Sequence, residues 1–229
     1  MLNRYNEVDK VVLAVDCIIF GFDKDGLKIL LIKRDFEPEK GKWSLMGGFL
    51  RKDEMLDQAA NRVLSTYTGL NNVYMEQLYT YSEIDRDPVE RTLSVSYYAL
   101  INIENHNEEL IKNYGAQWFC IKDMPKLIFD HAAMVDFAIK RLRYRTSIQP
   151  IGFELLPEKF TMRQLLELYE AILDKELDKR NFISKINSLG ILVKLEEKDM
   201  LSSRKGSYLY KFDKAKYEEK LTHNFAINL

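Results

Sequence analysis

One stretch of the sequence, residues 43–70, constrains the fold of this chain more than any other. It opens with two adjacent glycines, Gly47 and Gly48, which let a backbone turn come close to neighbouring groups. Apolar residues then recur at helical spacing and define one buried face: Leu56, Ala59, Ala60, Val63, Leu64 and Tyr67. Gly69 suits the left-handed conformation in which many helices end. The pattern predicts a glycine turn followed by a helix over about residues 53–67.

The spacing within this stretch resembles the Nudix box. That box is a glycine, five residues, a glutamate, seven residues, and then Arg-Glu-apolar-x-Glu-Glu-x-Gly-apolar. The residues that match it without a gap are Gly48, Glu54, Arg62, Leu64, Gly69 and Leu70. The three glutamates expected after Arg62 are replaced by Val63, Thr66 and Tyr67. The resemblance implies an α+β chain with a Nudix α/β/α sandwich, in which a helix packs on a sheet beside the glycine turn.

The missing glutamates bear directly on activity. In the Nudix family these carboxylates hold Mg²⁺ against a diphosphate, because a hard cation needs several anionic oxygens. Glu54 alone offers one carboxylate where several are expected. We therefore predict no catalytic residues, no metal site, no cofactor and no enzymatic activity. The alternative is a Nudix hydrolase of ADP-ribose or another nucleoside diphosphate derivative, with carboxylates recruited from Glu54, Asp57, Asp85 or Glu90.

Length and composition set broader limits. A chain of 229 residues can hold two domains, each with a core of its own. A formal net charge of −1 gives no global signature of a nucleic-acid partner. A nucleic-acid-binding function must therefore be inferred from local clusters of charge. No apolar run approaches the ~20 residues that span a membrane, and the first residues lack the apolar stretch of a signal peptide. A cytoplasmic protein without membrane contact is expected.

Apolar runs and polar loops alternate over residues 1–146. Strands are expected at residues 11–20, 27–32, 73–81, 93–103 and 115–119. Asp130 is expected to cap a helix that runs to about Arg145; a catalytic pair at Asp130 and His131 is the less usual interpretation of an aspartate that precedes a helix. This order of elements is what a Nudix sandwich requires.

Residues 146–157 contain Pro150, Gly152 and Pro157 and are typical of a linker. We therefore place a domain boundary between residues 146 and 147, which divides the chain into domains 1–146 and 147–229. After the linker, Thr161 is expected to cap one helix and Asp178 a second one that ends near residue 190. Two strands follow, at residues 191–195 and 208–212. Two helices with a short turn and then a β-hairpin are the pattern of a winged helix-turn-helix.

Local charge supports a DNA-binding role for this second domain. From Lys179 to Lys214 there are nine basic and four acidic residues, so the segment is +5 in a chain of net charge −1. Positive charge is needed where a protein contacts phosphates. The residues expected to bind DNA are Thr161, Lys179, Arg180, Asn181, Ser184, Lys185, Arg204 and Lys205. Those near the start of the second helix are placed to reach base edges, and Arg204 and Lys205 to contact the neighbouring backbone.

A Nudix frame without its metal carboxylates, followed by this module, resembles the Nudix-related transcriptional regulators of bacteria. The similarity includes Trp118-Phe119, Phe129-Asp130-His131, Phe160-Thr161, Leu168-Tyr169 and Arg180-Asn181-Phe182. The resemblance implies a homodimeric regulator, such as a repressor, whose Nudix domain senses a metabolite and whose wings bind double-stranded operator DNA. The effectors it implies are ADP-ribose or a sugar such as arabinose. We expect an uncharged sugar, because no carboxylate cluster is left to recruit a metal to a diphosphate.

The effector site is expected between the glycine turn and the loops that follow the strands. The residues predicted to line it are Lys33, Arg34, Trp43, Met46, Gly47, Asp85 and Arg91. They combine charged groups that can hydrogen-bond to hydroxyls or phosphates with one aromatic face. Besides the regulator and the hydrolase, a third hypothesis is a pseudo-enzyme adaptor that binds protein.

Overall fold

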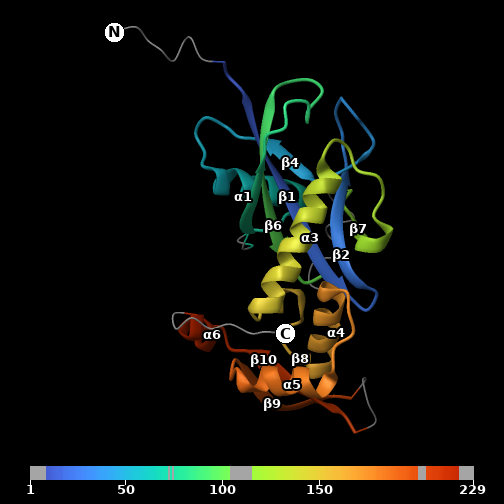
Figure 1. Ribbon diagram of the computed structural model, residues 1–229, viewed down its shortest axis with the longest axis vertical. Coiled ribbons are helices and arrows are strands. Elements are labelled where there is room, and N and C mark those ends of the chain that lie inside the picture. Colours follow the sequence, from blue (N-terminus) through green and yellow to red (C-terminus); the bar gives the residue numbers. More distant parts are fainter. Residues whose placement is uncertain (1–8, 72, 74, 104–114, 201–204, 222–229) are drawn as a thin grey trace.

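The structure is a computed structural model that describes residues 9–71, 73, 75–103, 115–200 and 205–221. It has a larger N-terminal half built on one sheet and a smaller C-terminal half built on another (Figure 1). Within these residues no helix combines the length and apolar character that crossing a membrane requires.

The N-terminal sheet has seven strands within the described residues, ordered β3-β2-β1-β6-β5, with β4 paired to β1 and β7 to β2. The strands are β1 (Val12–Asp23), β2 (Gly26–Lys33), β3 (Trp43–Ser44), β4 (Met46–Phe49), β5 (Met75–Tyr81), β6 (Thr92–Leu100) and β7 (Gln117–Cys120). β1 is central: it runs antiparallel to β2 and parallel to β6. Its middle is buried on both faces, as predicted.

Two helices cover opposite faces of this sheet and complete the predicted α/β/α sandwich. α1 (Leu56–Thr68) packs Ala59, Ala60 and Val63 against alternate residues of β1, including Val15 and Cys17. α3 (His131–Ile148) packs its apolar side against the other face of the same strand, around Ile18 and Phe20. Both arrangements follow from the two-residue alternation of side chains along a strand. α1 ends at Gly69 with φ 70°, so the predicted left-handed C-cap is confirmed.

The C-terminal half is a winged helix, again as predicted. Its elements are β8 (Phe160–Thr161), α4 (Met162–Leu173), α5 (Lys179–Ser188), β9 (Leu192–Asp199), β10 (Ser207–Phe212) and α6 (Lys214–Leu221), with sheet order β8-β10-β9. The Thr161 hydroxyl accepts a hydrogen bond from the backbone N of Gln164 at the start of α4. The Asp178 carboxylate does the same for Asn181 at the start of α5. Both predicted N-caps are therefore confirmed.

The two halves meet where α3 packs on α4. The Arg143 Nε donates to the carbonyl oxygen of Ile172 at 2.9 Å, and its Nη2 lies 3.2 Å from the carboxylate of Asp174. Short 3-10 turns at Ile121–Asp123 and Phe153–Leu155 flank this contact. α3 continues through Ile148, so the boundary that we place between residues 146 and 147 falls in its last turn.

Candidate functional site

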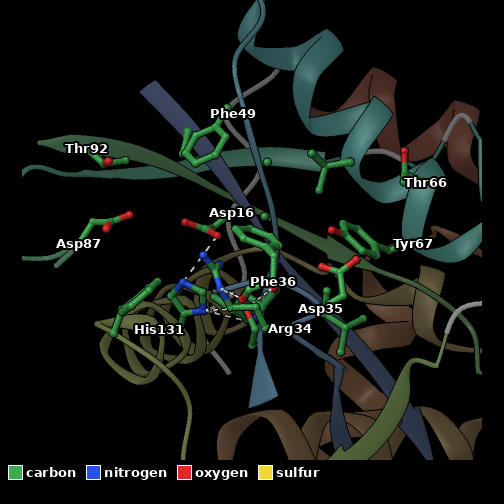
Figure 2. A pocket seen from close by; sticks show the side chains of 18 of the residues that line it. Asp16, Arg34, Asp35, Phe36, Phe49, Thr66, Tyr67, Asp87, Thr92 and His131 are labelled. Atoms are coloured by element: carbon green, nitrogen blue, oxygen red, sulfur yellow. Dashed lines mark hydrogen bonds and ion pairs between the residues drawn. The ribbon is translucent and has the colours of Figure 1, made fainter. Parts of the chain in front are cut away.

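A pocket of about 240 Å³ lies beside Gly47 and Gly48 of β4 (Figure 2). Its walls come from β1, β2, β4, α1, the loop before β6 and the start of α3. Val63, Thr66 and Tyr67, which stand where the Nudix box has glutamates, all line it. Two larger cavities, of about 500 and 630 Å³, lie between the two halves, and a third, of about 540 Å³, lies beside Trp43 and Phe129. None of the three is lined by Gly47 or Gly48. The Nudix frame therefore identifies the smaller pocket as the candidate effector site.

Gly47 and Gly48 lie within β4, so the turn predicted at these two glycines was wrong. Two close approaches explain why both positions hold glycine. A Cβ atom on Gly47 would lie 2.4 Å from the Asp16 Oδ1, and one on Gly48 would lie 2.7 Å from the Val63 Cγ2. Gly47 is the register partner of Asp16 on β1, so both residues belong to the pocket side of the sheet. These positions need glycine because the side chains of Asp16 and Val63 occupy the space that a Cβ atom would take.

The remaining glutamate of the box is held by an arginine of the same box. Glu54 accepts two hydrogen bonds from Arg62, 2.8 Å from Nε and 2.6 Å from Nη2, and a third from the backbone N of Arg51. The hydrogen bonds from Arg62 are the main reason why the pKa of Glu54 falls to about 2. Glu54 thus orders the loop before α1, while Arg62 also donates to the carbonyl oxygen of Phe49.

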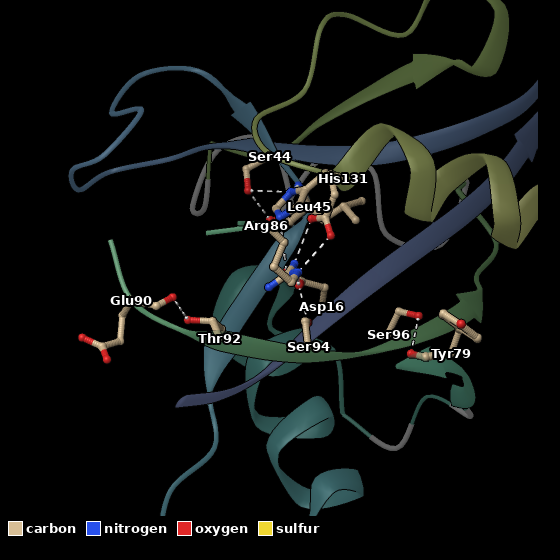
Figure 3. A network of polar contacts seen from close by, with 11 residues as sticks. Asp16, Ser44, Leu45, Tyr79, Arg86, Glu90, Thr92, Ser94, Ser96 and His131 are labelled. Carbon is tan, nitrogen blue, oxygen red and sulfur yellow. Dashed lines mark hydrogen bonds and ion pairs between the residues drawn. The ribbon is translucent and has the colours of Figure 1, made fainter. Parts of the chain in front are cut away.

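Figure 3 shows a buried network of charges behind the pocket. The Arg86 guanidinium, only 4% exposed, donates from Nε and Nη2 to the two carboxylate oxygens of Asp130, both at 2.9 Å. Its Nη2 also lies 3.7 Å from Asp16, which accepts a 2.5 Å hydrogen bond from the Ser94 hydroxyl. The network joins β1, β6, the loop between β5 and β6, and the residue that precedes α3. A buried charge needs partners of this kind.

The geometry corrects one prediction about this region. Asp130 precedes α3 but makes no side-chain capping bond, because its carboxylate is directed to Arg86. His131 accepts a hydrogen bond on Nδ1 from the backbone N of Leu45, which leaves the ring proton on Nε2, 3.7 Å from the Asp16 carboxylate. Burial, the largest effect, lowers the pKa of His131 and favours this neutral form.

Two of the predicted effector residues, Arg34 and Gly47, line the pocket. Five do not. Met46 is fully buried in the core, and Trp43 packs edge-to-face on Phe119 with the Lys33 ammonium 5.3 Å from its ring. Asp85 is exposed outside the pocket, and Arg91 donates to the carbonyl oxygens of Ser82 and Glu83 instead. The structure therefore does not bring these five residues into the pocket.

Sequence reasoning missed several residues that do line the pocket: Asp16, Phe36, Phe49, Asp87, Thr92, Phe129 and His131. For one of them, Asp16, the sequence contains a feature from which its role could have been predicted. Asp16 is the single charge within a run that is otherwise apolar, and a carboxylate at such a position must find a partner. Figure 2 shows Thr66 and Tyr67 on one side of the pocket and Asp87 and His131 on the other.

The candidate DNA-binding surface is formed by α5. Its five predicted residues are all exposed: Lys179, Arg180, Asn181, Ser184 and Lys185. Phe182 and Ile186 are buried on the opposite side and pack the helix on α4. Lys205, before β10, is exposed, and Arg204 lies outside the described residues. Thr161 is 2% exposed and its hydroxyl caps α4, so the structure does not place its side chain on the exposed surface of α5.

Comparison with known proteins gives the same division of the chain. The sequence model of the NUDIX domain matches residues 10–137, and that of the NrtR DNA-binding winged helix domain matches residues 152–212. The "ADPR responsive transcriptional repressor NtrR" of Acinetobacter baylyi is 31% identical over 223 residues, which cover 95% of this chain and 89% of that protein. An ADP-ribose pyrophosphatase of Methanocaldococcus jannaschii is 36% identical over 135 residues, 58% of this chain and 76% of that protein.

Crystal structures of Shewanella oneidensis NrtR are also similar. The complex with a 27mer DNA has a TM-score of 0.82 at 26% identity and covers 94% of this chain and 97% of that chain. The NUDIX domain of the same protein in complex with ADP ribose has a TM-score of 0.53 at 32% identity and covers 60% of this chain and 92% of that chain. A Nudix sandwich joined to a winged helix defines a class of two-domain transcriptional regulators. The chain belongs to the NrtR family within it.

Proposed function

We propose that this protein is a bacterial transcriptional repressor that binds operator DNA through its winged helix and is controlled by ADP-ribose in the pocket beside Gly47 and Gly48. The observation that carries the proposal is the combination, in one chain, of a Nudix pocket without its metal carboxylates and an exposed, basic α5. The descriptions of the Acinetobacter repressor and of the Shewanella complexes with DNA and ADP ribose support it.

The effector expected from the sequence was an uncharged sugar such as arabinose. That expectation assumed that a diphosphate needs a metal and that a metal needs the missing glutamates. The relatives favour ADP-ribose instead. The assumption fails physically because arginine can pair with phosphate oxygens directly, and Arg34 lines the pocket.

We propose further that the pocket binds its effector without hydrolysing it. The α1 residues that line the pocket are Arg62, Val63, Thr66 and Tyr67, and the Thr66 hydroxyl donates to the carbonyl oxygen of Arg62. None supplies a carboxylate for a metal-assisted attack on a diphosphate. The similarity to an ADP-ribose pyrophosphatase is the reason to test the hydrolase alternative. Metal-dependent release of AMP from ADP-ribose that disappears in Glu54→Gln would replace the regulator hypothesis with the hydrolase.

Assembly is part of the proposal. A homodimer with two-fold symmetry would present two α5 helices and would bind a near-palindromic operator with half-sites separated by whole helical turns. Such a DNA-binding protein would act in the cytoplasm. Light scattering of the purified protein measures the assembly, and a monomer at micromolar concentration would contradict it.

The main experiment is selection of duplex fragments from genomic DNA by the purified full-length protein, followed by binding isotherms on the selected sequence. We expect tight binding that ADP-ribose weakens and that arabinose leaves unchanged. Release by arabinose and not by ADP-ribose would reject the proposed effector. The absence of any preference between selected and scrambled duplexes would reject the DNA-binding function itself.

A further inference from the structure

We propose that Arg34 provides the positive charge that a divalent cation provides in Nudix hydrolases, so that this pocket binds the diphosphate of its effector without any metal. The inference rests on the proposed function, because it takes ADP-ribose as the ligand. It adds the chemistry by which the ligand is held and the residue that holds it.

The residues around the pocket do not fit a divalent cation. Glu54 is the one glutamate left from the box, and Arg62 already satisfies both of its carboxylate oxygens. Val63 offers no ligand atom, and the Thr66 hydroxyl is engaged with the helix backbone. Throughout the described ranges, no group of three or more His, Cys, Asp or Glu side chains is arranged to hold a metal ion. A hard cation needs several such oxygens.

Three arginines line the pocket, and two of them are already neutralised. Arg62 pairs with Glu54, and Arg86 pairs with Asp130 and lies near Asp16. Arg34 differs: across the part of the chain that the structure describes, no carboxylate forms an ion pair with it. An arginine in a pocket without a carboxylate partner is available to an anionic ligand.

The position of Arg34 is set by two aromatic rings. Its guanidinium carbon lies 3.7 Å from the centroid of the Phe36 ring and 5.3 Å from that of Phe129. Its Nε donates to the carbonyl oxygen of Phe36 at 3.1 Å. Stacking and this hydrogen bond restrict the side chain before any ligand arrives, and the terminal N–H groups stay available. Such a planar fork matches the oxygens of a phosphate.

Tyr67 completes the anion site. It stands at the last of the missing glutamate positions and lines the same pocket as Arg34. Burial, together with Asp35, raises the pKa of Tyr67, so the phenol keeps its proton and can donate a hydrogen bond to a phosphate oxygen. A glutamate here would repel a diphosphate unless a metal stood between them, whereas a phenol needs no metal.

Three carboxylates line the pocket. Asp16 already accepts a hydrogen bond from Ser94 and lies near Arg86. The other two are Asp35 and Asp87. They lie on opposite sides of it in Figure 2 and would repel phosphates placed next to them. Carboxylates accept hydrogen bonds from hydroxyl groups, so they suit the ribose ends of the ligand. The diphosphate between those ends would then lie next to the positive charge of Arg34.

The test is calorimetric titration of the full-length protein with ADP-ribose, in Mg²⁺ and separately in excess EDTA. We expect dissociation constants within about twofold of each other. Arg34→Gln should weaken binding by roughly ten- to a hundredfold, the range for charge-assisted hydrogen bonds. Adenosine, which has no phosphate, should bind both proteins equally. Arg91→Gln is the matched control, because Arg91 lies outside the pocket.

The outcomes separate this inference from the proposed function. Binding that EDTA abolishes and Mg²⁺ restores would overturn the metal-free site and leave ADP-ribose as the effector. No binding of ADP-ribose in either buffer would reject the effector and this inference with it. Operator binding by Arg34→Gln that equals wild type but resists ADP-ribose would show a folded protein and support the role of Arg34. Unchanged ADP-ribose affinity in Arg34→Gln would overturn it.

Discussion

Arg86 holds Asp130 through two hydrogen bonds of 2.9 Å, and so joins the loop before β6 to the first turn of α3. One end of α3 thereby belongs to the pocket, where His131 and Phe129 also stand. Its other end contacts α4 of the winged helix through Arg143. The helix has 18 residues, about 27 Å at 1.5 Å per residue. It is therefore one helix that contacts both the pocket and the winged helix.

Replacing Arg86 should destabilise the N-terminal half. Arg86→Met leaves the carboxylates of Asp16 and Asp130, 7% and 20% exposed, without their cation. Breaking a buried pair in this way costs about 3–5 kcal/mol of unfolding free energy. Urea denaturation followed by tryptophan fluorescence measures the loss. Arg163→Met, which removes an exposed pair with Glu167, is the control and should cost less than ~1 kcal/mol. Equal losses in the two variants would contradict the prediction.

His131 should make stability depend on pH. Its pKa is lowered by burial in the folded protein, so below the pKa of the unfolded chain, about 6.5, the unfolded state binds more protons. Stability should therefore fall as the pH drops through about 6.5 and stop falling below the lowered pKa of the folded state. His131→Gln should remove this component. Parallel curves for the two proteins, from urea melts at several values between pH 7.5 and 5, would show that His131 does not contribute.

Arg143 should carry the effect of the effector to the DNA-binding half. In Arg143→Ala, the separate affinities for ADP-ribose and for operator DNA should change by less than about twofold. The factor by which ADP-ribose weakens DNA binding should fall by about fivefold or more, since coupling energies are commonly 1–3 kcal/mol. Arg141→Ala, an exposed position on the same helix, is the control. Full coupling in Arg143→Ala would exclude this contact as the connection between the sites.

Two kinds of DNA contact should respond differently to mutation. Arg180 is exposed at the start of α5, where arginine can read guanine in a bidentate way worth roughly 1–3 kcal/mol. Arg180→Ala should relax the preference at particular bases. Lys205→Ala should weaken binding to all duplexes and reduce the salt dependence. Binding isotherms on operator and scrambled DNA at two salt concentrations measure both effects. Ser188→Ala, at the far end of α5, is the control.

Much of the fold follows from interactions that are close in sequence. The apolar face of α1, the left-handed Gly69, and the caps made by Thr161 and Asp178 all involve residues within four positions of one another or at a fixed period. Such features can be read from spacing, because helix geometry is the same wherever the helix lies. The predicted ends differ only slightly, as for α1, which begins at Leu56 instead of near residue 53.

Which residues line the pocket depends on the register between β1 and β4, which is not a local feature. Gly47 pairs with Asp16 and faces the pocket, whereas the adjacent Met46 pairs with Cys17 and is buried in the core. A shift of one residue would exchange these roles, because successive side chains of a strand point to opposite faces. The sequence placed both residues in the same stretch and could not tell them apart. The same holds for Thr161, whose burial follows from the pairing of β8 with β10.

The sequence by itself determined the order of a Nudix sandwich and a winged helix, and the exposed face of α5, because periodicity and local caps encode them. It did not determine that Gly47 and Gly48 lie within β4, where a turn was predicted. Only the tertiary structure decided which charges meet. Arg86 pairs with Asp130, 44 positions away, and Ser94 with Asp16, 78 positions away. These contacts exist because β1 and β6 run parallel side by side and α3 begins next to them. Among the residues that the structure describes, Arg34 has no carboxylate ion-pair partner, whereas Arg62 and Arg86 have one. Local spacing did not predict this difference, because it depends on which elements lie side by side.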